Sequence, residues 1–249
     1  MAIEKAASTV KIFGVRFDNV TLEEANKKFI GFMGNERLRT IYTPNPEIVM
    51  MAQEDDEFKV VLNEGDLVIP DGIGIVLASK VHHLGLNDRV PGIELMDLML
   101  EYCNRAGKSI FLFGGKPGVA EMAAENIKLA HPNLNIVGTR DGYFETGKEL
   151  KILDEINEKK PDILFVALGA SKQEKWIHRY KKTINASVAM GVGGALDVWA
   201  GTVRRAPVIF QKLGLEWFYR LIKQPTRFKR MLILPKFMLK VLFTKHIED

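Results

Sequence analysis

The chain has 249 residues, of which 47% are hydrophobic and 27% are charged. This balance is typical of globular proteins and excludes a disordered or fibrous protein. The single cysteine, Cys103, excludes an internal disulfide framework, and its apolar surroundings in sequence predict a buried thiol in a reducing compartment.

The formal net charge of +4 is distributed unevenly along the chain. From Gly201 to Asp249 there are 11 Lys/Arg and 3 Asp/Glu, whereas the first 200 residues hold 24 and 28. A mildly acidic body therefore precedes a strongly basic tail. Such asymmetry indicates a polyanionic partner, which could be nucleic acid, an anionic membrane surface or the phosphates of a substrate.

The first 200 residues predict a body in which short apolar strands alternate with helices. Strands are expected at residues 40–43, 66–69, 109–113, 135–138, 162–168 and 186–190. Helices are expected from Glu47, over 92–104, from Val119 and after Gln173. Continuous apolar strands separated by helices indicate an α/β fold with a Rossmann-like, mostly parallel sheet and helices on both faces.

Polar or glycine-rich turns follow most of these strands. They read TPN, PDGIG, FGGKPG, LGASKQ and GVGG. Ligands of parallel sheets bind at the carboxyl ends of the strands, where backbone N–H groups and helix N-termini favour anions. The turns together predict a phosphate- or nucleotide-sized pocket. None matches G-x-G-x-x-G or GxxxxGK[ST], which argues against NAD-binding and P-loop proteins.

Residues 202–249, the tail, are expected to form a basic amphipathic helical appendage to an α/β body at residues 1–201. A helical pattern over 207–223 is broken after Lys223, and a second segment follows over 227–246. Its apolar side chains alternate with Lys and Arg, as in helices that lie on anionic membranes. The apolar side chains between these cations are mostly aliphatic and offer no aromatic stacking platform, so we do not expect nucleic acid as a partner.

Several motifs together resemble those of the WecG/TagA/CpsF family of bacterial glycosyltransferases. They are TPNPEIVMMA (43–52), IPDGIGIV (69–76), RVPGIELM (89–96), FLFGGKPG (111–118), LGASKQEKWI (168–177), and VGGALDVWAG with RRAP (192–207). Each motif alone is modest, but the combination is highly specific and runs from about Ile12 to the C-terminus. Within the family the chain looks closest to the TagA type, the N-acetylglucosaminyldiphosphoundecaprenol N-acetyl-β-D-mannosaminyltransferases of wall teichoic acid linkage-unit synthesis.

The resemblance implies an inverting sugar transfer that needs no cofactor. The donor would be UDP-N-acetylmannosamine (UDP-ManNAc), and the acceptor would be the 4-hydroxyl of N-acetylglucosamine (GlcNAc) on undecaprenyl diphosphate. The enzyme would be cytoplasmic and peripheral on the inner face of the cell membrane, and its apolar tail could also form a homo-oligomer. The sequence leaves other donors open, namely UDP-N-acetylmannosaminuronic acid (UDP-ManNAcA) and UDP-glucose.

Asp71 follows the second strand and precedes Gly72. Aspartate is common in turns and helix caps, so the residue type alone favours a structural role. The resemblance instead implies a general base, whose carboxylate takes the proton of the acceptor hydroxyl as its oxygen attacks the anomeric carbon. A non-enzymatic nucleotide-binding membrane module would not need this carboxylate, so Asp71 distinguishes the two functions.

The resemblance also implies two groups of substrate-binding residues. Those expected to contact the sugars or the acceptor phosphate are Thr43, Asn45, Arg89 and Gln173. Those expected on the nucleotide side are Tyr143, stacking on the uracil ring, and Asp197. Gly114 and Gly115, also expected to bind substrate, allow a close backbone approach at the end of the third strand. The structural alternatives are a turn or helix start, a solvated arginine, or a core tyrosine.

Three arginines of the tail, Arg220, Arg227 and Arg230, could hold lipid phosphates at the membrane. Alternatively, the tail folds over the pocket as an active-site lid and brings them to the diphosphate of UDP. Departure of UDP builds negative charge that must be neutralised. Many nucleotide-sugar transferases use a divalent metal on a D-x-D motif, which this sequence does not contain. We therefore expect catalytic arginines in place of a metal.

Overall fold

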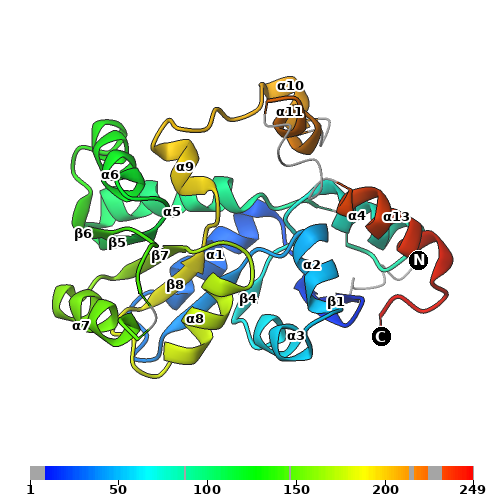
Figure 1. The fold of residues 1–249 in the computed structure, drawn as a ribbon, viewed down its shortest axis with the longest axis horizontal. Coiled ribbons are helices and arrows are strands. Elements are labelled where there is room, and N and C mark those ends of the chain that lie inside the picture. The colour runs from blue at the N-terminus through cyan, green and yellow to red at the C-terminus, as the bar shows by residue number, and fades with distance from the viewer. Residues whose placement is uncertain (1–8, 87, 146, 213–215, 224–231, 249) are drawn as a thin grey trace, which may run out of the picture.

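The six predicted strands form one parallel sheet at the centre of the molecule (Figure 1). The computed structural model describes residues 9–86, 88–145, 147–212, 216–223 and 232–248. The strands are β3 (Arg39–Tyr42), β4 (Leu67–Val68), β5 (Ser109–Gly114), β6 (Asn135–Arg140), β7 (Ile163–Ala167) and β8 (Val188–Gly191). Their order across the sheet is β4-β3-β8-β7-β5-β6, and every neighbouring pair is parallel.

The central strands are buried on both faces, which explains their uninterrupted apolar sequence. Every residue of β5 and β7 is buried. In β5, Phe111 and Phe113 belong to one apolar core, and Ile110 and Leu112 belong to the other. Alternate side chains of a strand point to opposite faces, so the two cores lie on the two sides of the sheet.

Helices cover both faces, as predicted (Figure 1). Those that pack in the first core are α2 (Pro46–Ala52), α3 (Asp56–Asn63), α4 (Ile73–Val81), α7 (Glu149–Lys159) and α8 (Lys172–Tyr180). Those in the second core are α1 (Leu22–Phe32), α5 (Gly92–Ala106), α6 (Val119–Ala130) and α9 (Ala195–Trp199). Cys103, on α5, is buried and free, and burial raises the pKa of its thiol to about 12. The predicted α/β fold is confirmed.

The N-terminal residues add an antiparallel hairpin that the sequence analysis did not predict. Its strands are β1 (Thr9–Ile12) and β2 (Val15–Asp18). The hairpin packs in the first core and meets the C-terminal end of the chain, where the N–H of Phe13 donates to the carbonyl of Ile247. Both ends of the described chain are therefore tied to the same side of the body.

The tail contains helices, as expected, but they differ in their surroundings. Its helices are α10 (Val208–Lys212), α11 (Glu216–Lys223) and α13 (Ile233–Phe243). Helix α13 packs on α2 and α4, and its Phe237 and Val241 are fully buried in the first core. Helices α10 and α11 lie apart from this contact, above the sheet in Figure 1. The boundary at residues 201 and 202 between a body and an appendage stays a prediction.

Candidate active site

A cavity of about 420 Å³ opens at the carboxyl edge of the sheet. The turns after β3, β4, β7 and β8 form its walls, which is the usual place for a ligand in a parallel sheet. The tail completes it with Glu216 and Trp217 of α11 and with Ile233 and Leu234 of α13. The body and the tail therefore share one site.

Asp71 lies on the wall of this cavity, half-buried in the turn between β4 and α4. Its backbone N–H donates to the carbonyl of Pro44 at 3.2 Å, which joins this turn to the one after β3. The next residue, Gly72, has a φ of 101°, a conformation that favours glycine, and it is the N-cap of α4. The carboxylate thus stands where a hydroxyl bound in the cavity can meet it, and its role as a base stays a prediction.

Thr43 and Asn45, in the turn after β3, also line the cavity. Thr43 is buried, and a Cβ on Gly92 would come within 3.1 Å of its Cγ2, so the start of α5 packs directly on it. Asn45 is the N-cap of α2, where its Oδ1 accepts the N–H of Ile48 at 3.1 Å. The structural alternative for Asn45 is confirmed, and the same side chain remains part of the cavity wall.

Arg89 and Gln173 both line the cavity, and hydrogen bonds hold both side chains in place. The Nη1 of Arg89 donates to Oε2 of Glu216 at 3.2 Å, and its Nη2 donates to the carbonyl of Gln211 at 3.3 Å. The alternative of a solvated surface arginine is therefore wrong. Gln173 is buried in the first turn of α8, and its Oε1 accepts the N–H of Gly193 at 3.1 Å.

The other predicted substrate-binding residues do not all reach the cavity. Asp197 lines it, from the first turn of α9. Gly114 and Gly115, at the end of β5, lie against Ala167 of β7, whose backbone a Cβ on Gly114 would overlap. Tyr143 is 65% exposed and lies outside the described cavity lining. The structure supplies a packing reason for Gly114, and the substrate contacts of these three residues stay predictions.

Carboxylates dominate the charge of the cavity. Its described acidic residues are Glu47, Asp71, Asp197 and Glu216, and its one described cation is Arg89. Arg220 lies on α11 with its side chain outside the described part of the structure, and Arg227 and Arg230 lie outside the described residues. Their catalytic roles stay predictions. Among the described residues, no group of three or more His, Cys, Asp or Glu could hold a metal ion.

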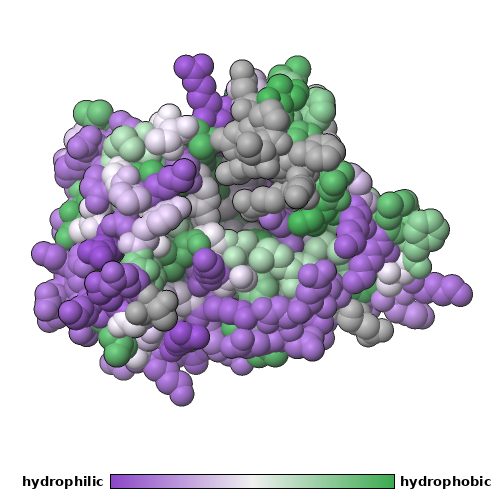
Figure 2. Space-filling model, viewed as in Figure 1, coloured by the Kyte–Doolittle hydropathy of each residue, from purple (hydrophilic) through white to green (hydrophobic). Residues whose placement is uncertain are grey.

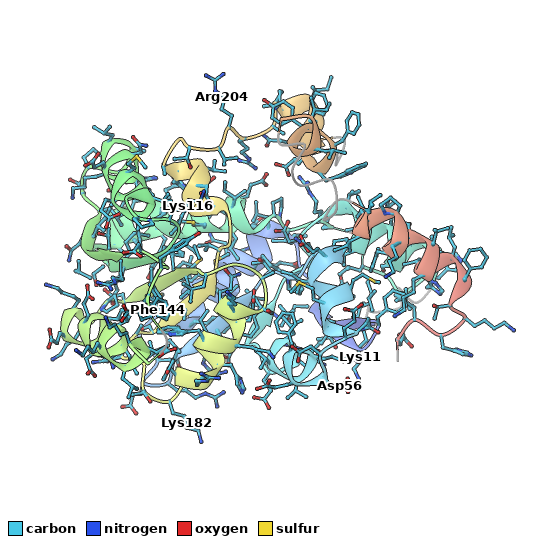
Figure 3. All side chains as sticks on the ribbon, viewed as in Figure 1. Lys11, Asp56, Lys116, Phe144, Lys182 and Arg204 are labelled. Carbon is cyan, nitrogen blue, oxygen red and sulfur yellow. The ribbon has the colours of Figure 1, made fainter. Side chains whose placement is uncertain are left out.

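The RRAP motif connects the body to the tail. Arg204 is exposed and points away from the molecule (Figure 3). Arg205 turns inward, with its Nη2 2.6 Å from Oε1 of Glu94 and its Nε 4.0 Å from Oε1 of Glu216. Burial raises the pKa of Asp97, which lies beside Arg205 at 4.0 Å. Arg205 thus ties the start of the tail to α5, and together with Arg89 it faces Glu216 of α11 at the cavity.

Glu216 and Trp217 are site residues that the sequence analysis missed. They stand in a helical pattern without a polar motif, and their role depends on folding the tail back onto the body. One signal was available, because Glu216 is the only acidic residue between Gly201 and Ile247. An isolated acid in a basic segment is a candidate partner for a distant cation, here Arg89.

These features define an α/β protein with a polar, carboxylate-lined cavity at the carboxyl edge of its sheet. Comparison with known proteins specifies this class further. The chain belongs to the glycosyl transferase WecG/TagA/CpsF family, which matches residues 10–248. The predicted family is therefore confirmed, and the chain is a glycosyltransferase.

Most of the chain is similar to proteins named N-acetylglucosaminyldiphosphoundecaprenol N-acetyl-beta-D-mannosaminyltransferase. The Bacillus subtilis (strain 168) protein is 41% identical over 202 residues, which cover 81% of this chain and 78% of that protein. The Staphylococcus aureus (strain MW2) protein is 36% identical over 245 residues, which cover 97% of this chain and 96% of that protein.

Proposed function

We propose that this glycosyltransferase moves N-acetylmannosamine from UDP-ManNAc to the 4-hydroxyl of GlcNAc on undecaprenyl diphosphate, in wall teichoic acid linkage-unit synthesis. The observation that carries the proposal is the similarity to the Staphylococcus aureus relative over 97% of this chain. That similarity includes both the body and the tail, which together line the cavity. The name of the relative gives the sugar and the lipid-linked acceptor.

Asp71 acts as the general base of this reaction. Its carboxylate takes the proton of the acceptor hydroxyl while the oxygen forms a bond to the anomeric carbon of the donor. The bond from that carbon to the β-phosphate breaks on the opposite side, and UDP leaves with the electron pair. The configuration of the sugar is therefore inverted. Thr43 and Gln173, which also line the cavity, hold sugar hydroxyls.

Arginines of the tail stabilise the leaving diphosphate. With four carboxylates and one arginine among its described lining residues, the cavity needs further cations before it can hold two phosphates. Arg227 and Arg230 belong to a segment with cavity residues on both sides, Trp217 before it and Ile233 after it. These two arginines and Arg220 supply the missing charge in place of a metal ion, which makes the tail an active-site lid.

The tail also contacts the inner face of the cell membrane, where the acceptor lipid resides. Leu239, Leu242 and Phe243 of α13 are exposed, and Figure 2 shows hydrophobic residues gathered at the end of this helix. Lys236 and Lys245 are exposed nearby in sequence. Apolar side chains in the acyl region with cations at the phosphates would hold the protein at a bilayer surface. Away from a membrane, the same surface could pair two copies of the chain.

Among the residues that the structure describes, no helix combines the length and the hydrophobicity needed to span a bilayer. Binding to lipid vesicles tests the proposed membrane contact. Replacing Leu242 and Phe243 with serine should weaken binding to anionic vesicles without changing turnover of a short, soluble acceptor. Unchanged vesicle binding would place the anchor elsewhere.

Product analysis tests the proposed reaction. The full chain is incubated with a short-chain lipid-diphosphate GlcNAc and separately with UDP-ManNAc, UDP-GlcNAc, UDP-ManNAcA and UDP-glucose, and the product masses are compared. We expect one N-acetylhexosamine to be added from UDP-ManNAc. UDP-GlcNAc is the matched control because its sugar has the same mass. Transfer from UDP-ManNAcA or UDP-glucose instead would assign another donor, and UDP binding without any transfer would indicate a non-enzymatic module.

A further inference from the structure

Glu174 is a fully buried carboxyl group that the proposed reaction does not use. It lies beside Gln173 in the first turn of α8. Its Oε1 accepts the Nε2 of Gln173 at 2.8 Å, whereas its Oε2 is buried without a hydrogen-bond partner. Buried carboxyl groups are costly when they are not fully paired, so a role for this one is worth testing.

The surroundings of Glu174 disfavour its charged form. Burial raises the pKa of Glu174 to about 7, although the Gln173 amide and the backbone N–H groups of Glu174 and Ser171 counteract this effect. Burial and the charge of Glu174 both raise the pKa of Tyr42, another member of the first core. Packing alone would be better served by an apolar side chain at this position.

Two hydrogen bonds, one of them to Glu174, fix the orientation of the Gln173 amide. A glutamine amide can rotate to exchange its oxygen and its nitrogen, which reverses what it offers to a ligand. Here Oε1 accepts the N–H of Gly193, and Nε2 donates to Glu174. Gly191 leaves room for the amide in this orientation, because a Cβ at that position would lie only 2.8 Å from Nε2. One orientation satisfies both hydrogen bonds, and its nitrogen keeps a second N–H.

We propose that Glu174 is a positioning residue for sugar transfer, which acts through Gln173. Its carboxyl group holds the amide as a donor on the cavity wall, and the amide in turn ties the turn after β8 to α8. Glu174 itself does not line the cavity among the described residues. The inference rests on the proposed function, because Gln173 matters for turnover only if it contacts the substrate.

Two substitutions of Glu174, by methionine and by glutamine, separate the orientation of the Gln173 amide from the packing of the core. Glu174→Met fills a similar volume without an acceptor and should lower kcat about 10- to 100-fold, the cost of leaving a buried amide N–H of Gln173 without its partner. Glu174→Gln keeps an oxygen acceptor and should restore most of the turnover. Arg179→Ala, at an exposed position of the same helix, is the matched control and should leave turnover unchanged.

A double-variant cycle tests whether Glu174 acts through Gln173. If it does, Glu174→Met combined with Gln173→Ala should turn over no more slowly than Gln173→Ala alone. If the double variant instead lost turnover by the product of the two single-variant factors, the proposal would be overturned. Wild-type turnover in a folded Glu174→Met variant would also overturn it. If that variant does not fold, Gly191→Ala displaces the amide from its other side and should reduce turnover by a similar factor; unchanged turnover there would overturn the proposal.

The wild-type chain separates this inference from the proposed function. Absence of product with every UDP-sugar would contradict the proposed function itself. Product formation by the wild type together with full activity of the Glu174→Met variant would contradict the positioning role alone.

Discussion

Replacing Phe237 with alanine is expected to destabilise the whole protein, because this residue of α13 belongs to the first core. Its side chain is 0% exposed, and its ring meets that of Phe13 edge to face, with centroids 5.8 Å apart at an interplanar angle of 83°. Loss of a buried aromatic ring, with the cavity that it leaves, costs about 3–5 kcal/mol. A typical domain has about 5–15 kcal/mol of stability, so the change removes a large part of it.

Thermal unfolding followed by circular dichroism measures this loss. For a chain of this size each kcal/mol lowers the melting temperature by about 2–4 °C, so we expect a decrease of roughly 6–20 °C. Phe243→Ala is the matched control on the same helix, since Phe243 is 83% exposed. It should change the stability by less than about 0.5 kcal/mol. Equal melting temperatures for the two variants would refute the inclusion of α13 in the core.

Three further outcomes follow from the electrostatics of the site. Turnover should survive EDTA, because the sequence has no D-x-D motif; complete loss that Mg²⁺ or Mn²⁺ restores would contradict this. Arg220→Ala, Arg227→Ala and Arg230→Ala should each lower turnover of a soluble acceptor by about 10- to 100-fold; unchanged turnover with weaker vesicle binding would mean that the arginines only hold lipid. The pKa of Glu174 rises on folding from 4.5 to about 7, so its protonated form favours the native state. Protonated Glu174 therefore stabilises the native state below pH 4.5. This stabilisation is lost as the pH rises to 7, which lowers the free energy of unfolding by about 3 kcal/mol. Urea unfolding at several pH values measures this loss. The Glu174→Gln variant should show a flatter dependence of stability on pH than the wild type between pH 4.5 and 7, and parallel dependences would contradict the pKa shift.

The sheet could be predicted from the sequence because its central strands are buried on both faces. Such strands are continuous apolar runs, and 163–167 is the clearest of them. The hairpin of β1 and β2 could not be predicted in the same way. Its strands have four residues each, and β1 alternates exposed and buried positions, with Thr9 and Lys11 outward. Short alternating segments near a chain end give too little periodicity to identify.

The site could be predicted where its residues follow strands. Thr43, Asp71 and Gln173 converge because the carboxyl ends of parallel strands share one edge. Glu216 escaped prediction because its contact with Arg89 joins positions 127 residues apart, and no local pattern encodes such a pairing. The sequence likewise shows that residues 233–243 are amphipathic, but only the packing of α13 on α2 and α4 decides which face is buried.

Asp71→Asn provides the most direct test of the proposed mechanism. The substitution keeps the shape of the side chain and removes its ability to take a proton. Turnover of UDP-ManNAc with a short, soluble acceptor should fall by about 10²–10⁴-fold, the usual loss of general-base catalysis, while the melting temperature and the UDP affinity from calorimetry stay at wild-type values. Turnover near the wild-type rate in this variant would contradict the assignment of Asp71 as the base.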